Sequence, residues 1–234
     1  MNIDLNCDLG EGCAFDAELM PLITSANIAC GFHAGDPATA LVALKAAARH
    51  GVQVGAHPGF PDREHFGRRD LERTSQQVYE DCVYQIGALA GLARAAGTGV
   101  RYIKLHGALY NMACRDDRYA QPAVDAAVLF GLPIFGLPHS RLQELAAGRC
   151  PFVAEGFADR RYLPDGSLVS RSRPDAFIED PADAVTQAEW LVRERGVQTI
   201  CVHGDNPRAL EFVRQLRDGL TSRGFQIAPF TPGN

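Results

Sequence analysis

The sequence predicts an α/β fold in which seven short apolar strands alternate with helices, as they do in a (β/α) barrel. Two observations lead to this prediction: a unit of strand, polar turn and helix recurs along the chain, and a polar side chain follows each predicted strand at once. Five of the seven histidines lie at such strand ends. Ligands of barrels and open α/β sheets bind at the carboxyl ends of strands, so this pattern is the strongest indication of function.

The predicted elements follow this unit from one end of the chain to the other. The predicted strands are residues 2–8, 26–30, 53–56, 102–105, 134–137, 152–154 and 199–202, with a possible edge strand at 225–229. The predicted helices are residues 16–23, 38–50, 75–96, 140–147, 181–195 and 208–222. No composition shift or low-complexity run divides the chain, so a single barrel domain over residues 1–234 is expected.

The stretch from residue 25 to residue 36, SANIACGFHAGD, shows the unit most clearly. A short apolar strand breaks at Gly31, and the turn then presents His33 and Asp36. Pro37 follows, and an Asp before a Pro is a favoured helix start because the Asp side chain caps the helix and the Pro lacks only an N–H that no helical bond needs. This stretch therefore predicts an imidazole and a carboxylate in one turn.

Composition excludes several kinds of partner. The formal net charge is -5 and the isoelectric point is about 5.8, which argues against nucleic acid and against an anionic membrane surface. No apolar run of 18 residues and no signal peptide is present, so a cytoplasmic protein is expected. The sequence contains no Walker A motif and no dinucleotide-binding glycine motif, and therefore no recognisable nucleotide cradle.

The seven cysteines form no C-x-x-C pair, which favours reduced thiols. Cys7, Cys30 and Cys201 lie inside predicted strands, where a thiol acts as a small hydrophobe. A nucleophilic Cys30 beside His33 is the alternative.

The first predicted strand ends in three polar side chains, Asn6, Asp8 and Glu11. Asn6 and Asp8 are two residues apart and share one side of the strand, which in a barrel is the lumen, whereas Leu5 and Cys7 take the other side. Carboxylates and an amide at a barrel mouth suit metal binding or acid/base chemistry. The alternative for Asp8 is a cap on the next turn.

The fourth predicted strand carries Lys104 and His106 on one side. The chain has only two lysines against twenty-one arginines, so a lysine inside an apolar strand is notable. We expect Lys104 and His106 to act together on a substrate carbonyl or carboxylate. The alternative is that Lys104 only neutralises Asp8 and Glu155.

Two long irregular segments are predicted to cover the mouth. Residues 57–70 contain prolines, glycines, Phe60 and Phe66, and their length suits a lid or a substrate wall. The arginines of this segment are able to hold an anionic ligand or to form surface ion pairs; they are Arg63, Arg68 and Arg69. The segment from residue 163 to residue 180 is a second candidate lid.

Several longer motifs identify a family. They are NCDLGE at residues 6–11, SANIACGFHAGD at 25–36, GAHPGFPD at 55–62, KLHGALYN at 104–111, EGFADRRY at 155–162 and HGD at 203–205. In these motifs, which extend over nearly the whole chain, the sequence resembles the LamB/YcsF family, whose characterised members are the A subunit of prokaryotic 5-oxoprolinase. One departure is Leu105, where the family usually has Pro; this residue faces away from the side shared by Lys104 and His106.

The resemblance implies a distorted, TIM-like barrel of seven β/α units, similar to polysaccharide deacetylases. It implies a role in opening 5-oxo-L-proline to L-glutamate with ATP as co-substrate, together with partner subunits B and C. The expected catalytic residues are Asp8, His33, Asp36, His57, Lys104, His106, Glu155, His203 and Asp205. The expected substrate-binding residues are Asn6, Glu11, Asn27, Asp62, Tyr110 and Asn111.

Two other functions stay open at this point. The first is a metal-dependent deacetylase or amidohydrolase that acts alone, with Asp8, His33 and His57 holding Zn²⁺ or a similar ion. The second is a non-catalytic subunit that holds substrate or orients the partners.

Overall fold

Seven parallel strands close into a barrel in the computed structural model, which describes residues 1–203 and 208–231. The strands are β1 (Asn2–Leu9), β2 (Ser25–Ala29), β3 (Gln53–His57), β4 (Val100–Lys104), β5 (Ile134–Gly136), β6 (Phe152–Phe157) and β7 (Thr199–Val202). Their order follows the chain, and the barrel closes because β1 pairs with both β7 and β2. A short strand, β8 (Gln226–Ile227), adds to the start of β1. The predicted barrel is confirmed.

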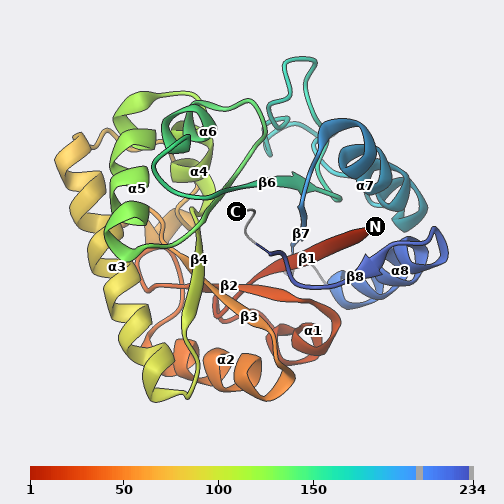
Figure 1. The fold of residues 1–234 in the computed structure, drawn as a ribbon, viewed down its shortest axis with the longest axis horizontal. Helices are drawn as coiled ribbons and strands as arrows, with labels where there is room; N and C mark the ends of the chain where they lie inside the picture. Colours follow the sequence, from red (N-terminus) through yellow and green to blue (C-terminus); the bar gives the residue numbers. More distant parts are fainter. Residues whose placement is uncertain (204–207, 232–234) are drawn as a thin grey trace.

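Helices surround the strands, as Figure 1 shows. They are α1 (Asp16–Leu19), α2 (Pro37–His50), α3 (Ser75–Ala95), α4 (Gly107–Ala113), α5 (Asp117–Phe130), α6 (Arg141–Ala146), α7 (Pro181–Arg195) and α8 (Ala209–Ser222), with 3-10 turns at Met20–Leu22 and Arg63–His65. Sequence reasoning missed α4 and α5. Gly107 at the start of α4 and Pro122 inside α5 are both residues that disfavour helices, and packing against the barrel outweighs them.

The predicted helix starts depend on side-chain caps that the structure contains. The Asp36 carboxylate accepts a hydrogen bond of 2.8 Å from the Thr39 N–H, and Pro37 begins α2. Thr74 and Gln77 form a reciprocal capping box at the start of α3. Asp36 is therefore an exposed helix cap.

Strand alternation divides the side chains of β1 between the helices and the lumen. Leu5 and Cys7 belong to the apolar core between barrel and helices. Asp4, on the opposite side, is buried in the lumen and accepts hydrogen bonds from the hydroxyl groups of Ser25 and Thr199 at 2.7 and 2.5 Å. The lumen is thus lined with polar groups, each of which must find a partner.

An aromatic cluster fills part of the barrel interior. The rings of Tyr102 and Phe135 stack with their centroids 4.1 Å apart, and Phe230 packs edge-on against both. Gly55 makes room for this cluster, because a Cβ atom there would lie 2.1 Å from the Tyr102 ring. The Tyr102 hydroxyl group donates to Asn27 at 2.6 Å and links the cluster to the polar residues.

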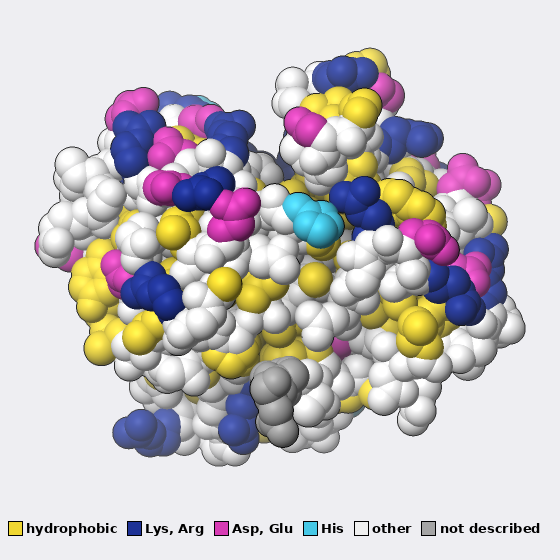
Figure 2. Space-filling model, turned by 45° about the horizontal axis from the view of Figure 1, so that its top comes forward, with side chains coloured by type: hydrophobic (Ala, Val, Ile, Leu, Met, Phe, Trp, Pro, Cys, Tyr) yellow, Lys and Arg dark blue, Asp and Glu magenta, His cyan; other side chains and the backbone are white. Residues whose placement is uncertain are grey.

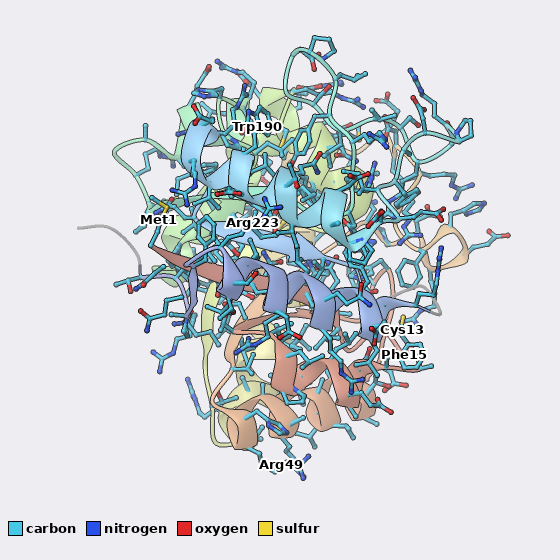
Figure 3. The ribbon with its side chains drawn as sticks, turned by 90° about the vertical axis from the view of Figure 1, so that its right-hand side faces the viewer. Met1, Cys13, Phe15, Arg49, Trp190 and Arg223 are labelled. Atoms are coloured by element: carbon cyan, nitrogen blue, oxygen red, sulfur yellow. The ribbon has the colours of Figure 1, made fainter. Side chains whose placement is uncertain are left out.

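The carboxyl ends of the strands face one end of the molecule. In Figure 3, Met1 before β1 lies at one side, and Cys13 and Phe15 after β1 lie at the other. Acidic and basic side chains are interspersed on the face shown in Figure 2, without a large patch of one sign. Within the described residues, no helix combines the length and the apolar character needed to cross a membrane.

Candidate active site

Lys104 lies at the centre of the barrel mouth, and its side chain is 2% exposed. Its Nζ atom lies 2.9 Å from Asp8 Oδ1, 3.0 Å from Glu155 Oε1, 3.1 Å from Asn6 Oδ1 and 2.9 Å from Cys201 Sγ. Burial alone would lower the pKa of Lys104, but Asp8, Cys201 and Glu155 raise it well above its usual value. The amine is therefore an ammonium ion that forms ion pairs with two carboxylates, Asp8 and Glu155, the contacts that the alternative role predicts.

This geometry adds a polar contact to the role expected of Cys201. The thiol is buried in the main apolar core cluster, as expected, but its Sγ atom also lies 2.9 Å from the Lys104 ammonium ion in the lumen. Cys30 is not an activated nucleophile, since burial raises the pKa of its thiol to about 12.

The Asp8 carboxylate has a partner on each oxygen. Oδ1 accepts from Lys104 and from the Asn27 side-chain amide at 2.8 Å, and Oδ2 lies 3.3 Å from His57 Nε2. Burial would raise the pKa of Asp8, but His57 and Lys104 outweigh burial and hold it well below its usual range. The carboxylate is therefore ionised and faces the pocket. The turn after β1 is capped by Asp16 instead, which accepts from the Gly10 N–H at 2.8 Å.

Three imidazoles meet beside Asp8. The rings of His33 and His106 stack with centroids 3.7 Å apart, and His57 lies edge-on to both. The Glu11 Oε1 atom is 3.3 Å from His33 Nε2, 3.5 Å from His106 Nδ1 and 4.0 Å from His57 Nε2. Strands β1, β2, β3 and β4 thus bring four donor atoms to one point.

Backbone carbonyls fix which nitrogen of two of these rings carries hydrogen. His57 Nδ1 lies 2.7 Å from the Lys104 carbonyl oxygen, and His106 Nε2 lies 2.8 Å from that of Phe66. A carbonyl only accepts, so both of these nitrogens are N–H donors. The remaining nitrogens, His57 Nε2 and His106 Nδ1, face each other at 3.0 Å. If both rings are neutral, the lone pairs of these two nitrogens face and repel each other. A cation bound between the two nitrogens would turn this repulsion into attraction.

The donor set fits a divalent metal ion. Ligand atoms about 2.0–2.2 Å from a tetrahedral ion lie roughly 3.3 Å from one another. Four pairs of these atoms are separated by 3.0–4.0 Å, and all the ligand atoms of the cluster lie within 4.8 Å of one another. Metal-binding imidazoles also usually donate their other N–H to a carbonyl or carboxylate, as His57 and His106 do. The cluster comprises Glu11, His33, His57 and His106, so the structure adds Glu11 and His106 to two members of the trio expected from the sequence. Asp8, the third member, contacts His57 but belongs to the neighbouring group.

That neighbouring group forms the other wall of the site. Ligand atoms of Asp8, Cys201 and His203 lie within 4.8 Å of one another. His203 Nδ1 and the His203 backbone N–H lie 2.7 and 3.1 Å from Asp159 Oδ2. Burial would raise the pKa of Asp159, but His203 lowers it overall. Asp159 was not predicted as a site residue, although it lies in the EGFADRRY motif after β6.

The remaining predicted residues separate into those near the pocket and those away from it. Tyr110 and Asn111 line the pocket, together with Asp8, Lys104 and His203. Asn27 is buried in the lumen, where it contacts Asn6 and Asp8, and Asn6 in turn donates to Glu155 at 3.1 Å. Asp36 caps α2, Asp62 contacts His65 and Arg69, and His139 is exposed beside Gln143. Asp205 lies outside the described residues.

The segment between β3 and α3 is a wall rather than a free loop. Arg63 donates to the carbonyl oxygens of Gly31 and Gly35 at 2.5 and 2.6 Å. Gly67 lies against the imidazoles, since a Cβ atom there would be 2.7 Å from His33 Cβ. From this wall Arg68 reaches the pocket. Two further lining arginines, at positions 160 and 171, were missed as site residues. Arg160 lies in the EGFADRRY motif, and Arg171 lies in the second candidate lid.

Fold and site together define a class: a closed parallel barrel whose mouth combines ionised carboxylates, a buried ammonium ion and a histidine cluster suited to a metal. The chain belongs to the LamB/YcsF family, whose match covers residues 3–234. It is 44% identical over 245 residues to a protein of Tolumonas auensis that is named as the A subunit of 5-oxoprolinase, covering 96% of this chain and 98% of that protein.

Solved structures agree with this membership. The lactam utilization protein from Thermus thermophilus is 40% identical, has a TM-score of 0.90, and the match covers 98% of this chain and 100% of that one. The catalytic domain of a peptidoglycan N-acetylglucosamine deacetylase from Eubacterium rectale shares the fold, with a TM-score of 0.56, 12% identity and coverage of 98% and 88%. The expected likeness to polysaccharide deacetylases is confirmed for the fold.

Proposed function

We propose that this chain is the A subunit of an ATP-dependent 5-oxoprolinase and that its barrel mouth binds and opens the lactam ring. The names of the 44% and 40% identical relatives support this substrate class. The observation that carries the proposal is the pair of Asp8 and His203, an ionised carboxylate and an imidazole within 4.8 Å of each other at the pocket. Opening a lactam requires a base and an acid at adjacent atoms, and this pair supplies both.

The reaction adds water across the amide bond, so that the carbonyl carbon gains OH and the ring nitrogen gains H. Asp8 is the ionised group that accepts the proton of the attacking water. His203, held by Asp159 through Nδ1, presents Nε2 to the departing nitrogen and gives it a proton. Lys104 keeps Asp8 charged. The coupling to ATP belongs to the complex with subunits B and C, since no phosphate-cradling motif occurs in this sequence.

A divalent ion in this site would be held by Glu11, His33, His57 and His106. Such an ion, when bound, polarises a carbonyl oxygen and lowers the pKa of a coordinated water. The residues of this chain keep their roles beside it: Asp8 moves the proton, and Lys104 balances the charge of Asp8 and Glu155.

Metal binding is a testable expectation for the isolated chain. The purified protein, stripped with a chelator, should bind one Co²⁺ or Zn²⁺ ion with the absorption spectrum of an imidazole-coordinated Co²⁺ complex. His57→Gln and His106→Gln should each weaken metal binding by roughly 10²-fold. This is the largest loss usually seen when a residue that hydrogen-bonds to a metal ligand is replaced, and His57 and His106 are assigned as ligands themselves. His50→Gln, at an exposed position on α2, is the matched control. Equal affinity in all variants, or no ion bound by the wild type, would contradict the assigned ligands.

The second candidate function is a deacetylase or amidohydrolase that acts alone, and the histidine cluster in a deacetylase-like barrel favours it. Release of acetate from N-acetylated sugar oligomers without ATP would establish this alternative. The proposed function is tested by formation of glutamate from 5-oxoproline, with and without subunits B and C.

A further inference from the structure

Three guanidinium groups from two segments of the chain line the pocket that contains Asp8 and His203. Arg160 follows β6, Arg171 lies in the irregular segment after it, and Arg68 belongs to the wall between β3 and α3. Arg68 lies far from the other two in the sequence, so the closure of the barrel brings the two segments together. None of them takes part in the acid/base chemistry assigned above.

Arg160 is the group that makes this a built site. The residue is 5% exposed, and its Nη2 atom donates to the Val169 carbonyl oxygen at 2.5 Å. Its Nε atom is buried without a hydrogen-bond partner. A buried donor on a charged group is costly to leave unfilled.

A second guanidinium group, that of Arg171, lies near Arg160 and affects its pKa. Arg160 and Arg171 both lie 5.2 Å from the centroid of the Phe177 ring. Burial and the nearby Arg171 lower the pKa of Arg160 to about 10, and Asp159 offsets only part of this effect. An anion bound beside Arg160 in the pocket would offset the effect of Arg171 on this guanidinium group, as Asp159 does in part.

We propose that Arg160, with Arg68 and Arg171, is the subsite for an oxyanion group of the substrate. Guanidinium groups bind carboxylate and phosphoryl oxygens with paired, charge-assisted hydrogen bonds. The proposal rests on the proposed function for the identity of the substrate, which is a lactam carrying a carboxylate. The subsite would hold that carboxylate on the side of β6, and so turn the amide bond toward Asp8 and His203. A phosphoryl group derived from ATP has the same chemistry and is the other possible source of the oxyanion.

Calorimetric titration of the full chain separates these sources. The three probes are 5-oxoproline, 5-oxoprolinamide, which has the same ring without the carboxylate charge, and inorganic phosphate. The wild type should bind 5-oxoproline at least about 10-fold more tightly than the amide, the size of one charged hydrogen bond. Arg160→Gln should abolish this preference and leave amide binding unchanged. Arg173→Gln is the matched control, because Arg173 is exposed and pairs with Asp175 in the same segment.

Each result has a defined meaning. If Arg160→Gln does not fold, Arg171→Gln, at a half-buried position, should still reduce the preference severalfold. Phosphate binding that depends on Arg160, without preference for 5-oxoproline over its amide, would support the subsite and identify a phosphoryl group as its ligand. Equal binding of all probes to wild type and variants, or no anion bound by the wild type, would overturn the subsite. Glutamate formation by the complex would in that case still support the proposed function.

Discussion

Replacing Asp8 with Asn is expected to lower the turnover of 5-oxoproline by about 10²-fold or more, the usual contribution of a general acid or base. Asn keeps the shape of the side chain and its contact with Lys104, but it cannot accept a proton from water. The carboxylate is the ionised group beside His57 and His203, so its loss removes the base at the amide bond. Initial rates of glutamate formation by the complex with subunits B and C measure the effect.

The control for Asp8→Asn is Asp70→Asn. Asp70 is an exposed aspartate that pairs with Arg115 outside the pocket, so the rate of this variant should match the wild type. A normal rate for Asp8→Asn, with an unchanged melting temperature, would show that Asp8 is not the base that opens the lactam.

Replacing Lys104 with Met is expected to lower the free energy of unfolding by about 3–5 kcal/mol, the cost of leaving buried charges without their partner. Met fills a similar volume, but Asp8 and Glu155 then face each other without the ammonium ion that lies within 3.0 Å of both. Urea unfolding measures the loss. Lys45→Met, at the other lysine and at an exposed position of α2, should change the free energy of unfolding by less than about 0.5 kcal/mol.

A double substitution makes the Lys104 result specific. Glu155→Gln removes one of the two carboxylates, so the variant with both Lys104→Met and Glu155→Gln should be more stable than Lys104→Met alone. If the free energy of unfolding of Lys104→Met lay within about 1 kcal/mol of the wild-type value, the ion pairs described for the barrel mouth would be contradicted. An effect of that size is typical of a substitution that breaks no buried ion pair. A double variant that is less stable than either single one would contradict these ion pairs as well.

Much of the fold followed from a simple rule of the sequence. Parallel strands in β/α units end at the same side, so His33, His57, His106 and His203 were expected near one another from their positions alone. The alternation along β1 likewise placed Asn6 and Asp8 together in the lumen. These predictions depend on local geometry, which a sequence contains.

The partners of each side chain depend on how the barrel closes, and local patterns in the sequence do not reveal these contacts. Lys104 contacts Cys201, 97 residues away, because β4 and β7 face each other across the lumen. We expected Lys104 and His106 to act together on a substrate. The sequence did not indicate that four atoms of other side chains surround the ammonium ion. Arg160 was also missed, since only the tertiary structure reveals its unfilled donor. His139 follows the strand-end rule but is exposed, and its backbone N–H donates to the Gln143 side chain at 2.6 Å.

The most direct test of the central claim, that this chain opens a lactam as one component of a larger enzyme, is a reconstitution assay. Purified chain, subunits B and C, ATP and 5-oxoproline are combined, each is omitted in turn, and glutamate is measured. Turnover is expected only in the complete mixture, with little or none from this chain alone. Glutamate formed at the same rate without this chain, or rapid ATP-dependent turnover by this chain alone, would contradict the proposed function.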